Sequence, residues 1–158
     1  MTTMDTPRSG QGLGGLYAGV FGPVERVGGP LVDLAFRLIM ARIFFQSGWL
    51  KLNDFENTVF LFQYEYAVPV LPPEIAAYFA TFFELAMPVL LVLGFMTRLA
   101  ALPLLGMALV IQFVLGASNP AYFQWEHYFW MLSLVYIFVR GAGPISLDHL
   151  IWRKSGTV

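Results

Sequence analysis

The sequence predicts an all-α integral membrane protein: a bundle of four transmembrane helices with short amphipathic helices at its interfaces. Of its 158 residues, 58% are hydrophobic and 12% are charged, with a mean hydropathy of +0.67. So few polar side chains cannot cover a soluble globule of this size. Four apolar runs, at 31–52, 75–95, 98–117 and 121–140, are each close to the ~20 residues that a spanning helix needs.

Breaker and turn residues separate these runs. Pro69, Pro72 and Pro73 prevent a continuous helix before the second run. Between the second and third runs, Gly94 permits a turn and Thr97 is suited to cap the next helix. Because this link is short, we expect the second and third helices to form an antiparallel hairpin.

Amphipathic segments flank the spans. Within 53–74, apolar residues recur at helical spacing and predict an interfacial helix: Phe55, Val59, Phe62 and Tyr66. We interpret this helix as a lid over the bundle, with a binding role as the alternative. We expect residues 1–30 to form a cytoplasmic, partly disordered segment with a frayed surface helix. Residues 141–158 form a cytoplasmic tail, in which Ser146 caps a short interfacial helix and Asp148 suits its dipole.

Basic residues predict the orientation of the transmembrane domain, residues 31–140. One side of a four-span arrangement carries Arg8, Arg26, Arg98, Arg140, Arg153 and Lys154, whereas the other has only Lys51 at its rim. The positive-inside rule therefore places both termini in the cytoplasm. We expect a multi-pass protein of the bacterial inner membrane, with residues 53–74 outside.

Composition also excludes several classes of function. A formal charge of −1 and a pI near 6.1 supply no basic surface for nucleic acid. Because the chain has no Cys, it has no disulfides, thiolate metal sites or thiol relay of its own. The polar, Gly-rich N-terminus is not typical of a signal peptide, and we expect it to stay uncleaved.

Arg37 and Arg42 lie inside the first apolar run. A guanidinium at bilayer depth costs at least ~2.5–3.5 kcal/mol, so such residues are candidates for a functional site. Counting residues along the helices places Arg42 and Glu84 near the midplane, with Glu84 in reach of both arginines. Arg37 and Glu84 then form either a structural ion pair or part of a functional site.

A second polar layer is predicted nearer the outer boundary. It comprises Gln46, Trp49 and Lys51 of the first run, Gln112 of the third, and Glu126 and His127 of the fourth. In these two layers and at Arg37, three cations (Arg37, Arg42 and Lys51) face two carboxylates (Glu84 and Glu126), which leaves one cation, or part of one, unpaired. Such a cation favours an anionic or electron-rich guest, such as a sulfur oxyanion or a quinone carbonyl. Lys51 and Arg98 could instead extend to the headgroups.

Neither haem nor a metal ion is expected. A bis-histidine haem needs a second histidine at matching depth, and His149 lies beyond the fourth run. The adjacent Glu126 and His127 project in different directions, so they make no metal motif. We predict instead that His127 forms hydrogen bonds or transfers protons. Aromatic residues crowd the start of the fourth run, as an interfacial belt or as a pocket on which a quinone stacks.

Several separated motifs together resemble the DoxX family of small four-helix membrane proteins. They are "FRLIMARIFFQSGWLKL", "EL" followed by Pro88, "LGFMTRLAAL" and "GPISLDHL", within residues 31–150. One branch of that family supplies the small subunit of thiosulfate:quinone oxidoreductase. Another, which "FQYEYAVPVLPPEIAAYFATFFEL" resembles, accompanies enzymes that build metal-binding modified peptides. The family pattern corresponds to Arg37, Gly48, Lys51, Glu84 and Arg98, whereas Arg42 stands where the pattern is apolar or aromatic.

Two functional interpretations remain. In the first, the chain is a membrane subunit of a quinone-linked oxidoreductase whose partner supplies electrons. Arg37, Glu84 and His127 are then the candidate catalytic residues, and the candidate quinone-binding residues are Arg42, Gln46, Trp49, Lys51, Gln112 and Glu126. In the second, a noncatalytic module anchors or assembles a partner subunit or homo-oligomer, or passes a small solute, within a metal- or sulfur-handling complex.

Overall fold

The computed structural model describes residues 13–66 and 71–154, and every regular element in these ranges is helical. The all-α prediction is therefore confirmed for this part of the chain. The predicted disorder near the N-terminus falls largely on residues 1–12, which lie outside the described residues. The elements are α1 (Leu13–Asn53), α2 (Phe55–Leu61), η1 (Phe62–Tyr66), α3 (Pro73–Leu93), α4 (Thr97–Leu109), η2 (Val110–Leu115), α5 (Gly116–Ser118), η3 (Pro120–Tyr122), α6 (Trp125–Arg140) and α7 (Leu147–Lys154).

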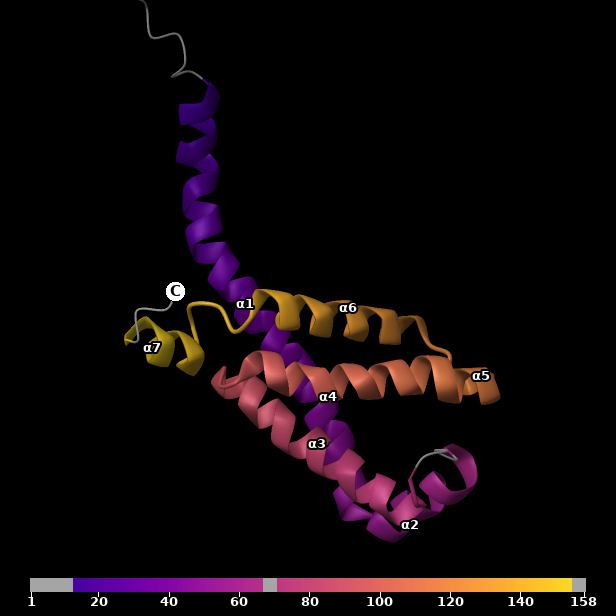
Figure 1. Cartoon of the computed structure of the whole chain (residues 1–158). Coiled ribbons are helices and arrows are strands. Elements are labelled where there is room, and N and C mark those ends of the chain that lie inside the picture. Colours follow the sequence, from indigo (N-terminus) through magenta and orange to yellow (C-terminus); the bar gives the residue numbers. More distant parts are fainter. Residues whose placement is uncertain (1–12, 67–70, 155–158) are drawn as a thin grey trace, which may run out of the picture.

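Four long helices build the bundle. α1 packs against α3 and α6, and α4 packs against α3 and α6, around a core that includes Met40, Phe44, Leu91, Leu104 and Leu134. We call the end of the bundle that holds α7 and the α3–α4 turn the inner end, and the end that holds α2, η1 and η3 the outer end (Figure 1). The N-terminal half of α1 extends away from the bundle beyond its inner end (Figure 1).

Two helices, Pro73–Leu93 and Thr97–Ser118, are long and apolar enough to cross a membrane. The second of these joins α4, η2 and α5. α6 has only 16 residues, which is short of the ~20 that span a bilayer, and the apolar half of α1 carries Asp33, Arg37 and Arg42. Membrane crossing by α1 and α6 therefore stays a prediction.

The surface helix expected before residue 31 is present, but it is not separate from the first apolar run. α1 runs without a break from Leu13 to Asn53, with Pro23 and Pro30 inside it. A proline removes one backbone hydrogen bond, but the turns on either side of it can remain helical. Residues 13–30 are therefore a continuation of the first long helix.

The lid predicted within 53–74 does pack on the bundle. Asp54 caps α2 by accepting a hydrogen bond from the Asn57 amide (3.2 Å). The apolar stripe then packs against α3 through a small cluster that joins Phe55, Val59, Phe62 and Tyr66 to Ala76 and Ala77. This packing brings η1 over the outer end of α3.

The α3–α4 hairpin is confirmed, but its cap differs from the prediction. Gly94 ends α3 in the left-handed region, at φ 65°. The Thr97 side chain does not cap α4; the Asp148 carboxylate does, by accepting hydrogen bonds from the backbone amides of Met96 (2.8 Å) and Thr97 (3.0 Å). Ser146 caps α7 as predicted, since its hydroxyl accepts from the His149 amide (3.1 Å).

Candidate functional site

A cavity of about 490 Å³ lies at the outer end of the bundle. Side chains from α1, η1, α3, α4, η2, η3 and α6 line it, so elements that are distant in the sequence form its walls. Its polar lining residues are Ser47, Lys51, Tyr66, Glu84, Tyr122 and His127. The remainder of the wall is apolar, and includes Phe62, Phe83, Met107, Val110, Leu115 and Trp130.

An ion pair crosses from α1 to α3 at the cavity wall. Lys51 Nζ lies 2.7 Å from Glu84 Oε2 and donates a second hydrogen bond to Ser47 Oγ at 2.7 Å. The Glu84 side chain is 5% exposed and that of Lys51 is 19% exposed. Because an ammonium has three N–H groups, one donor of Lys51 remains for a further acceptor.

Gly48 allows the two helices to meet at this level. A Cβ on Gly48 would lie 2.8 Å from Glu84 Cβ and 2.9 Å from its carbonyl carbon, which is closer than real atoms approach. A glycine therefore brings α1 against the backbone of α3 beside the carboxylate. The same contact sets which residue of α1 is level with Glu84.

His127 is oriented by Gln112. Gln112 Oε1 lies 2.8 Å from His127 Nδ1 and also accepts from the Gln124 backbone amide at 3.3 Å. Because a backbone N–H can only donate, the atom that both groups face is the oxygen, and His127 Nδ1 therefore carries a proton. Nε2 is then the nitrogen that can accept or release a proton. The imidazole packs beside Trp130, with ring centroids 4.7 Å apart.

The π-helical turn η2 carries Gln112. Such insertions widen a helix by one residue and are frequent at functional sites. Gln112 is fully buried, and its Nε2 has no hydrogen-bond partner among the described residues. The insertion thus places an amide with unused donor capacity directly behind His127.

Two tyrosines, one from η1 and one from η3, meet at the cavity. The Tyr122 hydroxyl donates a hydrogen bond to the Glu65 carboxylate, and the rings of Tyr66 and Tyr122 pack edge to face at 5.7 Å. Burial, followed by the hydrogen bond to Glu65, raises the pKa of Tyr122 above its usual value. Burial likewise raises the pKa of Tyr66. Both hydroxyls therefore stay protonated at neutral pH.

Arg37 lies in a second polar cluster, at the inner end. Its side chain is buried, and its guanidinium donates to the carbonyl of Leu91 at 3.0 Å and to that of Ile145. A Cβ on Gly94 would collide with this guanidinium and with Ser146. Arg37 therefore ties the end of α3 to the segment that leads into α7.

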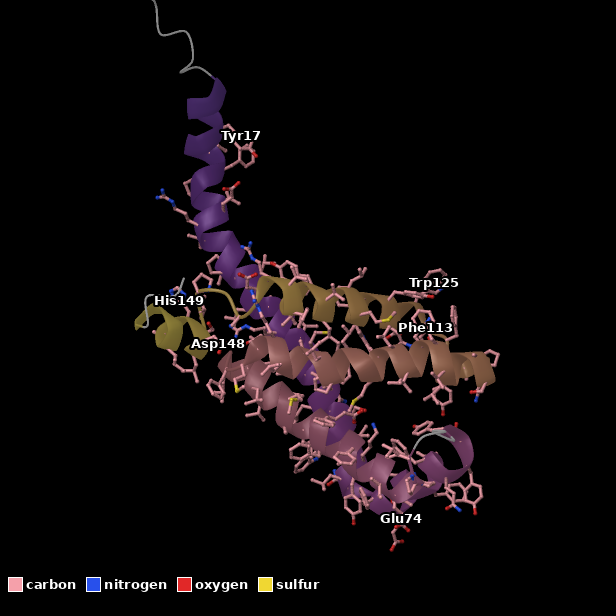
Figure 2. The ribbon with its side chains drawn as sticks, in the orientation of Figure 1. Tyr17, Glu74, Phe113, Trp125, Asp148 and His149 are labelled. Atoms are coloured by element: carbon pink, nitrogen blue, oxygen red, sulfur yellow. The ribbon has the colours of Figure 1, made fainter. Side chains whose placement is uncertain are left out.

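Asp33 completes the inner cluster. Its Oδ1 accepts from the Tyr136 hydroxyl at 2.6 Å and lies 3.5 Å from Arg140 Nε. A Cβ on Gly143 would come within 2.6 Å of the other carboxylate oxygen. Figure 2 shows Asp148 and His149 at this end of the molecule and Phe113 and Trp125 at the other. The protein itself thus fills the space around the inner charges.

Residues 32–117 match the family model for DoxX, which is more than half of the chain. The chain belongs to the DoxX family. An uncharacterized protein of Haemophilus influenzae is 29% identical over 134 residues, which cover 81% of this chain and 88% of that relative. No solved structure matches the chain. Membership of DoxX and the two apolar helices make this a membrane protein.

In this DoxX chain, the predicted ion pair between Arg37 and Glu84 was wrong. Arg37 contacts α3 at Leu91, whereas Glu84 pairs with Lys51. Leu91 and Glu84 are seven residues apart, or ~10 Å along a helix. Counting residues along the sequence does not reveal how far α1 and α3 overlap. In the structure, this overlap brings Gly48 rather than Arg42 to the level of Glu84.

The structure brings together some of the predicted site residues and separates others. Lys51, Glu84 and His127 line the outer cavity, and Gln112 contacts His127, so these two residues lie at a similar level, as the sequence predicted. The residues outside the cavity lining are Arg37, which is buried in the inner cluster, and Arg42, Gln46, Trp49 and Glu126, which are exposed. Arg42 lies beside the last two turns of α3, so the prediction that it is level with Glu84 was wrong.

Sequence reasoning missed Ser47 and Asp33. Ser47 lies one helical turn before Lys51, and Asp33 one turn before Arg37, so spacing along one helix face was the signal that could have found both. The described residues contain no group of three or more His, Asp or Glu that could hold a metal ion.

Proposed function

We propose that this chain is the membrane subunit of a quinone-linked oxidoreductase and that the outer cavity holds the quinone headgroup. One observation carries the proposal: the Lys51–Glu84 ion pair and His127 line the same apolar cavity of about 490 Å³. This volume falls within the roughly 300–1,000 Å³ of small-molecule sites, which combine apolar walls with a few polar groups.

The lining fits a flat ring with carbonyl acceptors. The third N–H of Lys51 and the Nε2 side of His127 are the groups suited to carbonyl oxygens, and Trp130 and Phe83 supply apolar faces. A quinone, when bound, supplies a two-electron acceptor. His127 can hold or release a proton at Nε2 because Gln112 keeps Nδ1 protonated. Since the chain has no Cys to relay electrons, a partner subunit supplies them.

The test uses a variant that removes the ion pair without leaving one charge unpaired. The protein is purified, extracted with solvent and analysed for quinone by mass and ultraviolet spectrum. We expect quinone in extracts of the wild type, little in extracts of Lys51→Met/Glu84→Gln, and wild-type content in the exposed control Gln46→Leu. A wild-type extract without quinone, together with no turnover of added quinol by any partner fraction, would refute the proposal.

The second candidate function is a noncatalytic module that assembles a partner complex. The observation that favours it concerns Arg37, whose guanidinium donates to two backbone carbonyls and does not line the cavity. If buried charges serve only packing, Lys51→Met/Glu84→Gln should assemble with its partner and support the activity of the complex as the wild type does. Loss of activity in an assembled complex favours the quinone site instead.

A further inference from the structure

A second hollow, of about 340 Å³, lies between α1 and α3 on the lateral surface of the bundle. Ala41 and Pro88 are buried at its floor, and exposed apolar side chains form its sides, among them Leu38, Phe45, Val89 and Val92. Arg42 is the charged residue in its lining. The hollow is separate from the outer cavity, and the two share no lining residue.

Arg42 is exposed and forms no ion pair or side-chain hydrogen bond within the described ranges 13–66 and 71–154. It differs in this from Arg37 and Arg140, which bind groups of the chain itself. A guanidinium beside hydrocarbon is costly unless an anion or acceptor meets it. We therefore expect a molecule that carries negative charge to bind beside Arg42.

The level of Arg42 limits what that occupant is. The residues opposite it, from Pro88 to Leu93, form the last turns of α3, so Arg42 lies within ~8 Å of the inner end of that helix. Helical side chains point back toward the helix N-terminus, which for α1 is the direction of the inner end. The guanidinium thus reaches toward the membrane surface while the hollow beneath it is apolar.

We propose that this hollow binds one phospholipid with an anionic headgroup, with its phosphate on Arg42 and an acyl chain over Ala41 and Pro88. A guanidinium matches a phosphate with two parallel hydrogen bonds. A second copy of this chain fits less well, because the exposed carboxylates of the described residues lie elsewhere: Glu25 on the extended part of α1, and Asp54, Glu56, Glu65, Glu74 and Glu126 toward the outer end. The proposal does not depend on the quinone.

The test compares two lipids on the purified full-length chain. Native mass spectrometry measures retention of phosphatidylglycerol against phosphatidylethanolamine for the wild type and for Arg42→Gln. We expect the wild type to prefer the anionic lipid by about fivefold, and Arg42→Gln to lose that preference. Arg26→Gln, which changes an exposed arginine on the extended part of α1, is the matched control and should keep it.

Val89→Trp tests the apolar part of the site, because a large side chain there fills the hollow without changing the charge. It should lower retention of both lipids. The proposal is overturned if Arg42→Gln keeps the wild-type preference. It is equally overturned if Arg42→Gln releases a co-purifying membrane protein while lipid retention stays unchanged, since a partner helix with a carboxylate would then be the occupant.

Discussion

At the inner end, Arg37 and Asp33 are surrounded by groups of the protein, whereas at the outer end Lys51, Glu84 and His127 line a cavity. The inner charges bind backbone carbonyls, a tyrosine hydroxyl and a neighbouring arginine, and a Cβ at position 94 or 143 would collide with them. The outer groups bind each other and also face an apolar cavity. Buried charge alone therefore does not mark a binding site; unfilled space beside it does.

The largest expected effect is the loss of stability when the Lys51–Glu84 ion pair is broken, and it tests whether that pair is buried. Lys51→Met leaves the Glu84 carboxylate without its partner and should cost ~3–5 kcal/mol of stability. Lys51→Met/Glu84→Gln should recover much of that loss, because no lone charge remains. Thermal and denaturant unfolding in detergent measure both. Strictly additive effects of the two substitutions would show that the residues do not interact.

Substituting one glycine at each end of the bundle tests how tightly the two clusters are packed. Gly48→Ala places a Cβ against the α3 backbone and should cost ~1–3 kcal/mol. Gly94→Ala meets Arg37 and Ser146 and also forces alanine to φ 65°, which adds ~1–2 kcal/mol. Gly106→Ala, with open space around its Cβ, is the control and should cost nothing or stabilise slightly, because alanine favours a helix more than glycine does. Equal losses at positions 48 and 94 would contradict the tighter inner packing.

A smaller effect is expected from the cap that closes the inner end. Asp148→Asn weakens two hydrogen bonds to the start of α4 and should cost ~1 kcal/mol, as lost caps do. Hydrogen exchange at the first turn of α4 and in α7 should accelerate, while exchange at the outer end stays unchanged. Asp54→Asn, at the cap of α2, is the matched control and should affect only the outer end. Faster exchange throughout the bundle after Asp148→Asn would argue against a local cap.

The smallest expected effect concerns Tyr122 at the edge of the outer cavity. Burial and the hydrogen bond to Glu65 raise its pKa above the usual 10.0. The folded state therefore holds this proton more tightly, and the stabilisation is present below pH 10 and is lost as the pH rises further. The tyrosinate absorbance of the wild type minus that of Tyr122→Phe measures the titration. Glu65→Gln should shift it toward lower pH; an unchanged curve would exclude the Glu65 contact.

Local patterns predicted most of the elements. The α3–α4 hairpin, the Ser146 cap and the contact between Gln112 and His127 each depend on residues near one another in sequence or on equal depth in neighbouring helices. The four-span arrangement is a prediction that the two apolar helices support only in part. Whether the site residues act in catalysis also stays a prediction.

The failures share one physical cause, which is the register between helices that are distant in the sequence. The depth count placed Arg42 level with Glu84, but the close contact at Gly48 shifts α1 along α3. Thr97 had the right residue type for a cap, yet Asp148, 51 residues away, occupies that position. A single sequence carries propensities and periodicity, and neither specifies how two helices slide against each other.

The contacts of the C-terminal segment have a consequence for biosynthesis. The Arg37 guanidinium donates its second hydrogen bond to the carbonyl of Ile145, and the Asp148 carboxylate caps the first turn of α4. A ribosome makes residues 145 and 148 after α1, α3 and α4, so the donors of Arg37 and of the first turn of α4 lack these partners until translation has passed residue 148. A chain that ends before residue 145 would leave those donors without their partners, so the inner end of the bundle depends on a segment that is made after the helices it holds together.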